Sequence, residues 1–444
     1  MIAPARVAAY ETVLAVAAGR ADLPSALARA RRHLADDRDR ALAGEIATGT
    51  LRWQAAFDHV IALFAGRPPA KLDPEILAIL RIGMFQLLHL DRVPAAAVVD
   101  DAVELARKAG KRSASGFVNA LLRRVSRERA HLPLPEQPPI DYLSITLSHP
   151  RWLAERWIAR HGVDAATAWA RFDNAPAPLT LRANLLKTTR EQLAGDLARE
   201  GVITAAARFA PDALVVTGGN PLLTPLARTG MFLVQDEASQ LVGAFAAAAP
   251  GERILDACAS PGGKTTQMAA AMGGDGTVVA ADVRGRRLDL LARTVAESGA
   301  MNVRVVQSNA RAAPPFHQVF DAVLVDAPCS GLGTIRRDPD VRWRRAESDL
   351  RSLAAAQLEM LIHLATIVRP GGRLIYSTCS SEPEENEDVV RAFLAGHPDF
   401  RRETPSTFSA RPELSALLDA EGAFKTLPFR DGLEAFYAAA LRRQ

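Results

Sequence analysis

The stretch Asp256-Ala-Cys-Ala-Ser-Pro-Gly-Gly-Lys-Thr265 decides the fold of this chain of 444 residues. It follows an apolar segment at 253–257, which we predict to be a strand, and it precedes a predicted helix over 265–272. Glycines at such a junction let backbone amides approach a bound ligand. Because open α/β sheets bind ligands outside the carboxyl ends of their strands, the stretch predicts a ligand crevice at one edge of such a sheet.

The second half of the chain alternates predicted strands with predicted helices, which indicates a parallel, doubly wound sheet of the Rossmann-like α/β class. The predicted strands are 253–257, 277–281, 303–307, 320–325 and 372–376. The segment 424–440 is predicted as two further strands around an Asp431-Gly432 turn. We expect these two strands to form an antiparallel pair at the sheet edge.

The rest of the chain divides into three parts. Apolar residues recur at helical spacing from Arg6 to Arg129, whereas the proline-dense segment 131–140 cannot continue a helix. Short elements follow: a helix over 152–160, a strand over 179–186, a helix over 188–200 and strands near Val202 and Leu214. The predicted domains are therefore an all-α domain at 1–130, a linker at 131–140, a small α+β domain at 141–235 and the α/β domain at 236–444.

The composition excludes several classes of protein. With 48% apolar and 23% charged residues, the chain is typical of a globular protein. Its three cysteines are too few for a disulfide framework and lack the spacing of metal ligands, so we expect no metal and a reducing, cytoplasmic location. Neither a signal-peptide pattern nor a long apolar run is present, so we expect no membrane association. The net charge of +4 fits a polyanionic partner without identifying one.

Three polar residues end successive predicted strands beside the expected crevice. Asp282 suits a ribose diol, which would indicate an adenosine-containing cofactor, although an acid at this place is also a common helix cap. Asn309 has the donor and acceptor needed to contact an adenine edge, or it forms a turn. Asp326 is interpreted as a functional carboxylate. The loop lacks the glycine spacing of a dinucleotide fingerprint or a phosphate-binding P-loop, which disfavours a kinase.

Two further cysteines lie in motifs that follow predicted strands, and together with the loop they suit a single reaction. Cys329 follows Asp326 in the run Asp326-Ala-Pro-Cys-Ser-Gly331, and Cys379 follows the fifth predicted strand in Ser377-Thr-Cys-Ser380. Carbon 5 of cytosine accepts a methyl group only after a nucleophile has added to C6, and a thiolate suits that addition. A carboxyl group near N3 and a base for the C5 proton are also needed. The residues therefore predict cytosine-C5 methylation, with either cysteine as nucleophile and no chemical role for Cys258.

These motifs resemble those of the RNA cytosine-5 methyltransferases related to bacterial Sun/Fmu, and the resemblance covers nearly the whole chain. Besides the first two runs already quoted, it rests on Val234-Gln-Asp-Glu-Ala-Ser-Gln-Leu241, Arg337-Asp-Pro-Asp-Val-Arg-Trp343 and Tyr376-Ser-Thr-Cys-Ser380, which contains the third. The resemblance implies a Rossmann-like, S-adenosyl-L-methionine-dependent methyltransferase domain. Within the matching runs, Trp343 is interpreted as a packing residue.

The resemblance also implies roles for individual residues. S-adenosyl-L-methionine would be bound by Cys258, Ala259, Ser260, Pro261, Gly262, Gly263, Lys264, Asp282, Asn309 and Asp326. The cysteine of the Thr-Cys-Ser motif is the family's nucleophile, so Cys379 would attack and Cys329 would help to release the methylated product. Asp326 would stabilise N3 or act as a base. The family usually has Asp at the position of Asn309, which predicts a weaker or altered contact with the cofactor.

The N-terminal part resembles the RNA-binding antitermination factor NusB, and the middle part resembles a small RNA-recognition-like subdomain. The resemblance implies small-subunit (16S) ribosomal RNA as substrate, with transfer RNA as the alternative; DNA is disfavoured. A non-catalytic RNA-binding or ribosome assembly factor is the alternative of a different class. We expect a monomer. The phosphate-contacting face is predicted at Arg107, Lys108, Lys111, Arg112, Arg123, Arg124, Arg127 and Arg129.

Overall fold

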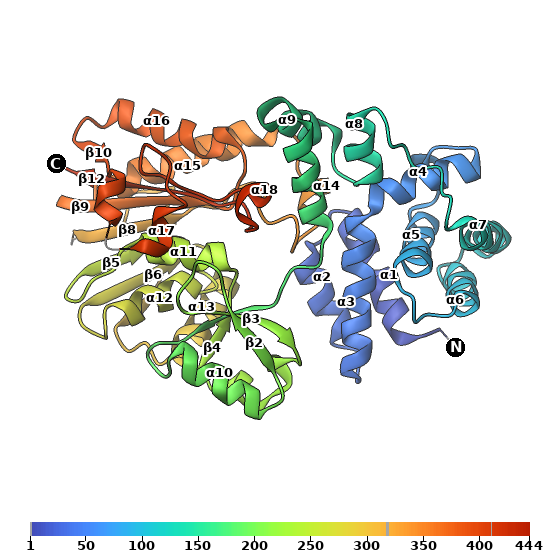
Figure 1. Cartoon of the computed structure of the whole chain (residues 1–444), viewed down its shortest axis with the longest axis horizontal. Coiled ribbons are helices and arrows are strands. Elements are labelled where there is room, and N and C mark those ends of the chain that lie inside the picture. The colour runs from blue at the N-terminus through green and yellow to red at the C-terminus, as the bar shows by residue number, and fades with distance from the viewer. Residues whose placement is uncertain (1, 317–318, 410) are drawn as a thin grey trace. The chain divides into compact units, whose positions relative to one another are not determined.

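A computed structural model describes residues 2–316, 319–409 and 411–444 (Figure 1). Contacts between residues divide the chain into two compact units. The first comprises Met1–Pro176 and Ile335–Glu347, and the second comprises Ala177–Thr334 and Ser348–Gln444. These borders differ from the four predicted parts, because residues up to 176 pack with the N-terminal helices and a segment of the predicted α/β domain joins them. The four-part division itself stays a prediction.

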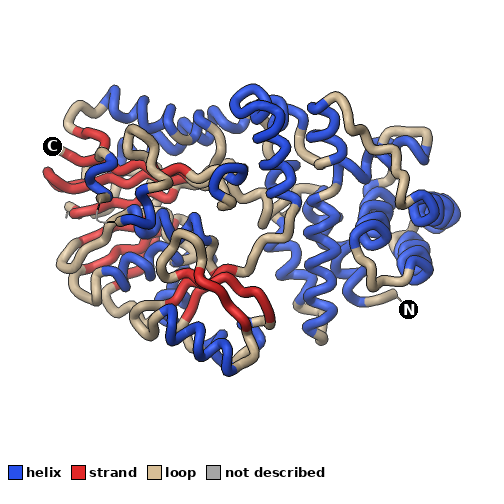
Figure 2. The backbone as a smooth tube through the Cα atoms, in the orientation of Figure 1, coloured by secondary structure: helices blue, strands red, loops and turns tan. Residues whose placement is uncertain are grey.

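The first unit is all helical across its described residues, as predicted for its N-terminal part (Figure 2). Helix α5 is buried along most of its length and packs against α1, α3, α6 and α7. Side chains of Asp22 and Asp36 cap α2 and α3 by accepting backbone N–H groups. The helices are α1 (Pro4–Ala17), α2 (Leu23–Arg31), α3 (Asp37–Arg52), α4 (Gln54–Ala65), α5 (Pro74–His89), α6 (Ala95–Lys108), α7 (Ser115–Glu128), α8 (Pro139–Asp141), α9 (Arg151–Asn174) and α14 (Val341–Arg344).

Two features of this unit differ from expectation. The helix predicted over 152–160 extends to Asn174 as α9, with a kink at Gly162, where φ is 82°. The segment Ile335–Glu347 is anchored by the fully buried Arg342, whose Nη1 donates to the Ser148 carbonyl at 2.7 Å and to Asn174 Oδ1 at 3.1 Å. Trp343 Nε1 donates to the Leu51 carbonyl at 2.7 Å, which agrees with its interpretation as a packing residue.

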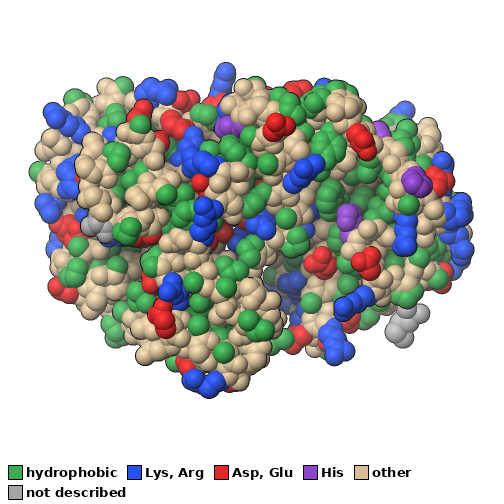
Figure 3. Space-filling model, viewed as in Figure 1, with side chains coloured by type: hydrophobic (Ala, Val, Ile, Leu, Met, Phe, Trp, Pro, Cys, Tyr) green, Lys and Arg blue, Asp and Glu red, His purple; other side chains and the backbone are tan. Residues whose placement is uncertain are grey.

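Basic side chains gather at the right-hand edge of the space-filling view, over α7 (Figure 3). Several members of the predicted phosphate-contacting face are engaged in local ion pairs. Arg107 pairs with Glu104, Arg124 with Glu128, and Lys111 with Asp73. The face therefore carries less net positive charge than its eight basic residues suggest.

The second unit begins with a small four-stranded antiparallel sheet in the order β2-β3-β1-β4. Helix α10 (Arg190–Arg199) packs Leu193 and Leu197 onto it, and a capping box of Thr189 and Gln192 starts this helix. The strands are β1 (Thr180–Ala183), β2 (Ile203–Ala206), β3 (Ala213–Gly218) and β4 (Phe232–Val234). The strands and the helix predicted between 179 and 218 are thus confirmed.

The larger sheet has the order β10-β12-β9-β8-β5-β6-β7, and the five strands from β9 to β7 run parallel. All five parallel strands predicted from the sequence are confirmed. The chain order reverses between β5 and β8, which are neighbours, and this is where such sheets bind ligands. The strands are β5 (Arg253–Asp256), β6 (Thr277–Asp282), β7 (Val303–Gln307), β8 (Phe320–Asp326), β9 (Val368–Thr378), β10 (Phe400–Arg402), β11 (Phe424–Lys425) and β12 (Tyr437–Arg443).

The expected hairpin around Asp431-Gly432 is confirmed only in part. β12 pairs antiparallel with β9 and β11 pairs with β12, but the short helix α18 (Pro428–Asp431) stands in place of a simple turn. Pro428 supplies a φ that suits the start of a helix, and Gly432, with φ 71°, ends it in the left-handed region.

Helices cover both faces of the larger sheet (Figure 1). Ile254 and Leu324 point into a core shared with α11 and α12, whereas their neighbours Leu255 and Val323 point into a core shared with α15 and α16. This burial on both faces explains why the parallel strands are continuous apolar runs. The helices are α11 (Glu237–Phe245), α12 (Gly263–Ala271), α13 (Gly285–Ser298), α15 (Asp349–Ala365), α16 (Glu387–Gly396) and α17 (Pro412–Ser415). Within the described residues, no helix combines the length and apolar character needed to cross a membrane.

Candidate active site

The loop between β5 and α12 packs closely against α13 at Gly262. Gly262 has φ 107°, a backbone conformation that favours glycine, and a Cβ there would lie 3.0 Å from Leu291 Cδ1 on α13, which is tighter than an ordinary contact. At the start of the loop, the buried Asp256 accepts a hydrogen bond from Thr265 Oγ1 at 2.7 Å. Burial raises the pKa of Asp256 to about 7, and the neighbouring Asp326 adds to this rise, whereas the Thr265 hydrogen bond opposes it.

Asp282 lies at the carboxyl end of β6 and is tied to the same loop. Its Oδ1 accepts the backbone N–H of Val283 at 2.8 Å, and its Oδ2 accepts the backbone N–H of Ser260 at 3.3 Å. Arg287 Nε lies 3.3 Å from Oδ2, and Arg287 Nη2 donates to the Ser260 carbonyl. Asp282 thus fixes the position of the loop, and its contact with a ribose stays a prediction.

Asn309 is exposed at the end of β7. Its Oδ1 accepts the backbone N–H of Arg311 at 3.0 Å, which is the turn-forming arrangement that was the alternative to an adenine contact. The cofactor role of Asn309 stays a prediction.

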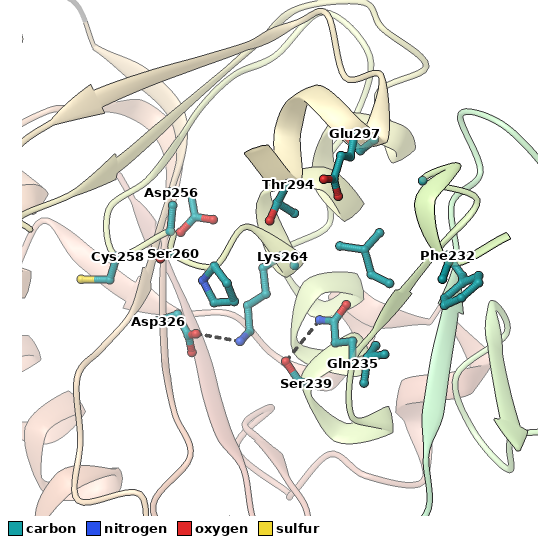
Figure 4. A pocket seen from close by; sticks show the side chains of 18 of the residues that line it. Phe232, Gln235, Ser239, Asp256, Cys258, Ser260, Lys264, Thr294, Glu297 and Asp326 are labelled. Carbon is teal, nitrogen blue, oxygen red and sulfur yellow. Dashed lines mark hydrogen bonds and ion pairs between the residues drawn. The ribbon is translucent and has the colours of Figure 1, made fainter. Parts of the chain in front are cut away.

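Asp326 is held between two donors at the carboxyl end of β8, and Figure 4 shows one of them, Lys264. Lys264 Nζ donates to its Oδ2 at 2.7 Å, and Ser377 Oγ donates to its Oδ1 at 2.8 Å. Burial acts to lower the pKa of Lys264, but the charge and the hydrogen bond of Asp326 outweigh it, so this pKa is raised. Lys264 therefore stays cationic beside Asp326 at neutral pH.

The two candidate reactive cysteines lie together. Cys329 Sγ and Cys379 Sγ are 3.1 Å apart, which is within hydrogen-bonding distance for sulfur. The hydrogen bond with Cys379, burial, and the charges of Cys379 and Glu385 raise the pKa of Cys329 well above its ordinary value. Burial chiefly raises the pKa of Cys258 as well, which fits a thiol without chemistry of its own.

Two buried charged residues that support this site were missed by sequence reasoning. Arg182, on β1, donates from Nη2 to Thr266 Oγ1 at 2.8 Å and from Nη1 to the Gly263 carbonyl, so it joins the small sheet to the cofactor loop. Burial lowers its pKa to about 10. Glu385 accepts hydrogen bonds from Ser330 and Ser380, which adjoin the two cysteines. The available signals were an arginine within the apolar run 179–183 and the acidic run 382–385 directly after Cys379.

A cavity of about 330 Å³ opens beside the loop. Its lining combines Cys258, Ser260 and Lys264 with Gln235 from the end of the small sheet and Asp326 from β8 (Figure 4). Among the described residues, no group of three or more His, Cys, Asp or Glu side chains is placed to hold a metal ion.

The fold and the site together define a methyltransferase with an N-terminal NusB-like domain and a ferredoxin-like subdomain. Residues 245–442 match the family model described as 16S rRNA methyltransferase RsmB/F, residues 3–127 match the NusB family, and residues 149–222 match the ferredoxin-like domain of RsmF/B-like methyltransferases. The chain belongs to the family of ribosomal RNA small subunit methyltransferase B. The family resemblance and the fold class predicted from the sequence are thereby confirmed.

Three relatives illustrate the extent of the similarity. The Bacillus subtilis protein named probable ribosomal RNA small subunit methyltransferase B is 33% identical over 92% of this chain and 91% of its own length. The ribosomal RNA small subunit methyltransferase B of Pseudomonas putida is 34% identical over 98% of both chains. The crystal structure of PH0851 superimposes with a TM-score of 0.83 and 28% identity, covering 100% of this chain and 99% of that one.

Proposed function

We propose that the protein transfers a methyl group from S-adenosyl-L-methionine to carbon 5 of a cytosine in small-subunit ribosomal RNA, through a covalent adduct between a cysteine and C6. The observation that carries this proposal is the pair of cysteine sulfurs 3.1 Å apart, on loops that follow the carboxyl ends of β8 and β9. A methyltransferase that only transfers a methyl group to an intrinsically nucleophilic atom needs no such pair. The names of the relatives favour ribosomal RNA over transfer RNA as substrate.

The loop residues fit S-adenosyl-L-methionine. Gly262 places no side-chain atom in the turn, and α12 begins at Gly263 and Lys264 with N-terminal amides. We assign the cofactor to residues 258–264 together with Asp282, Asn309 and Asp326. When bound, it supplies an electrophilic methyl group.

Cys379 acts as the nucleophile in this proposal. Its thiolate adds to C6 of the cytosine, and the ring electrons move toward C5, where the methyl group is accepted. Asp326 lies beside Lys264 and Ser377, in a position to stabilise the ring at N3. Removal of the C5 proton then restores the C5–C6 double bond and expels the Cys379 thiolate.

Cys329 suits the release step because of its electrostatic surroundings. While Cys379 is free, the hydrogen bond with Cys379, burial and the charge of Cys379 raise the pKa of Cys329 and keep its thiol protonated. Once Cys379 has become a neutral thioether, its charge no longer opposes ionisation of Cys329. Formation of the adduct thus removes the opposing charge of Cys379, while burial and Glu385 continue to raise the pKa of Cys329. We assign Cys329 as the base for the C5 proton because its sulfur lies beside that of Cys379.

The test uses methyl transfer from labelled S-adenosyl-L-methionine to unmodified small-subunit ribosomal RNA, with denaturing gels to detect covalent RNA adducts. We expect Cys379→Ala to abolish both methyl transfer and the adduct, and Cys329→Ala to accumulate the adduct. Loss of the adduct in Cys329→Ala instead would reverse the two roles. Transfer to transfer RNA alone would change the substrate, and tight binding of cofactor and RNA without any transfer would favour a binding or assembly factor.

We propose that RNA phosphates contact the surface of α6 and α7. Among the described residues, Lys108, Arg112 and Arg127 have no carboxylate within ion-pairing distance, unlike Arg107 and Arg124. Replacing these three residues by Glu should weaken RNA binding and make the salt dependence of the dissociation constant less steep by roughly one unit of slope per lost phosphate contact. The same replacement of Arg107 and Arg124, which already pair with carboxylates, is the control and should have a smaller effect. Equal effects would reject this assignment.

A further inference from the structure

Glu385 is a buried carboxylate on the short 3₁₀ helix Pro383–Glu385, directly after the Thr-Cys-Ser run. Its side chain is 0% exposed. Oε1 accepts the backbone N–H of Ser330 at 2.8 Å and Gln357 Nε2 at 2.9 Å, and Oε2 accepts the hydroxyl of Ser380 at 2.5 Å. A carboxylate is an acceptor only, and here three donors from three separate parts of the chain converge on it.

The partners of Glu385 are the immediate neighbours of the two reactive cysteines. Ser330 follows Cys329, Ser380 follows Cys379, and the two serine Oγ atoms lie 3.1 Å apart. One carboxylate therefore joins the loop after β8 to the loop after β9. The sulfurs of the two cysteines on these loops lie 3.1 Å apart.

We propose that Glu385 is a positioning residue for product release: it holds the Cys329 loop against the Cys379 loop, so that Cys329 faces the adduct carried by Cys379. This inference rests on the proposed function. In the step concerned, the Cys329 thiol first loses its proton to solvent. The C5 proton then passes to the Cys329 thiolate, the electron pair of the C5–H bond forms the C5–C6 double bond, and the bond between C6 and Cys379 Sγ breaks. The sulfur of Cys379 keeps that electron pair as a thiolate, so atoms and charge balance.

A role limited to folding predicts different consequences from a positioning role. If the hydrogen bonds only stabilise the loops, their loss lowers the free energy of unfolding and slows every step that needs a folded site. If they set the register of the two sulfurs, their loss slows release more than attack, because attack requires only Cys379. The adduct then accumulates, as in Cys329→Ala.

The experiment compares the full-length protein with Glu385→Ala and Glu385→Gln. A glutamine keeps the shape, accepts from Ser330 and Gln357 through its Oε1, and donates to Ser380 Oγ, whose hydroxyl can turn toward Ser330. Glu237→Ala is the matched control, because Glu237 is also buried and accepts the backbone N–H groups of Phe209 and Ala210 away from the cysteines. The measurements are the fraction of protein in the RNA adduct, the methyl transfer rate, and the dissociation constant of S-adenosyl-L-methionine.

We expect Glu385→Ala to increase the adduct fraction relative to methyl turnover by about tenfold, the equivalent of one buried hydrogen bond to a charged group. The dissociation constant of the cofactor should not change, and Glu385→Gln should restore turnover. An unchanged adduct fraction in folded Glu385→Ala overturns the inference. So does accumulation in Glu385→Gln as strong as in Glu385→Ala, because the charge rather than the hydrogen-bonded geometry would then matter.

Two further results keep the test decisive. If Glu385→Ala does not fold, Ser380→Ala removes the hydroxyl that donates to Glu385 Oε2 and also contacts Ser330 Oγ and the Glu382 backbone N–H, and it should likewise accumulate adduct. The absence of accumulation in that variant overturns the inference. If the wild type transfers no methyl group and Cys329→Ala traps no adduct, the proposed function itself has failed; if both behave as expected and only the Glu385 variants do not, only the positioning role has failed.

Discussion

Asp256→Asn should change how the stability of the second unit depends on pH. Burial raises the pKa of Asp256 from 3.8 to about 7, so in the folded protein this carboxyl holds its proton up to near-neutral pH. In the unfolded chain it ionises near its ordinary pKa. Folding therefore becomes less favourable as the pH rises from about 4 to about 7, because ionisation stabilises only the unfolded state.

The size of this effect follows from the pKa shift. About three pH units at 1.36 kcal/mol each give about 4 kcal/mol of stability that the wild type loses across this interval. The structure supports a near-isosteric replacement, because Asp256 Oδ2 accepts from Thr265 Oγ1 and Asp256 Oδ1 has no hydrogen-bond partner among the described residues. Asparagine offers a carbonyl oxygen for the Thr265 hydroxyl and carries no charge at any pH. The variant should therefore lack this part of the pH dependence.

The assay is urea unfolding of the wild type and Asp256→Asn at pH 5 and pH 7.5, followed by circular dichroism. Tryptophan fluorescence identifies the transition of the other unit, because all five tryptophans of the chain lie in the first unit. Other titrating groups are common to both proteins and cancel in the difference between them. The free energy of unfolding of the variant, relative to wild type, should rise with pH. A constant or falling difference would show that Asp256 is already ionised in the folded protein and would refute the argument.

Three further predictions concern the site. Arg182→Met should lower the free energy of unfolding of the second unit by about 2 kcal/mol, because the Gly263 carbonyl loses a charged donor. It should also weaken cofactor binding measured by calorimetry. An unchanged cofactor affinity would show that the small sheet does not influence the cofactor loop. Hydrogen peroxide should oxidise Cys329 and Cys379 to a disulfide, since their sulfurs need to approach by only about 1 Å, and dithiothreitol should restore methyl transfer; peptide mapping that finds both thiols free after inactivation would contradict this. Asn309→Ala should raise the dissociation constant of S-adenosyl-L-methionine. If the dissociation constants of the variant and the wild type are equal, Asn309 only forms the turn and does not contact the cofactor.

The parallel sheet could be predicted from the sequence because its strands are buried on both faces. Ile254 and Leu255 point to opposite cores, so both positions must be apolar and the strand stands out as a continuous run. The glycine loop could be predicted because glycines at a strand-to-helix junction stand out in the sequence, and the positive φ of Gly262 is a conformation that favours glycine. In both cases, the fold restricts which residues are accepted at neighbouring positions, and this restriction is visible as a local pattern in the sequence.

Glu385 and Arg182 escaped prediction because their roles depend on partners distant in the sequence. An acidic run after Cys379 is typical of a solvated turn, and only the folded chain brings Ser330 and Gln357 onto Glu385. An arginine in a short strand is typical of an exposed edge, whereas Arg182 is buried against α12. Contacts of this kind leave no periodicity in the sequence.

The segment Ile335–Glu347 shows how a motif of one domain can belong structurally to another. It begins directly after Thr334, whose own contacts assign it to the unit that holds Cys329, yet it packs with the helical unit through Arg342. Burial lowers the pKa of Arg342 to about 9, and its guanidinium finds Asn174 Oδ1 and the Ser148 carbonyl as acceptors. The chain thus passes between the units on both sides of this segment. Within the second unit, the Cys329 loop is held by Glu385, which accepts the backbone N–H of Ser330, before the chain enters the segment at Ile335.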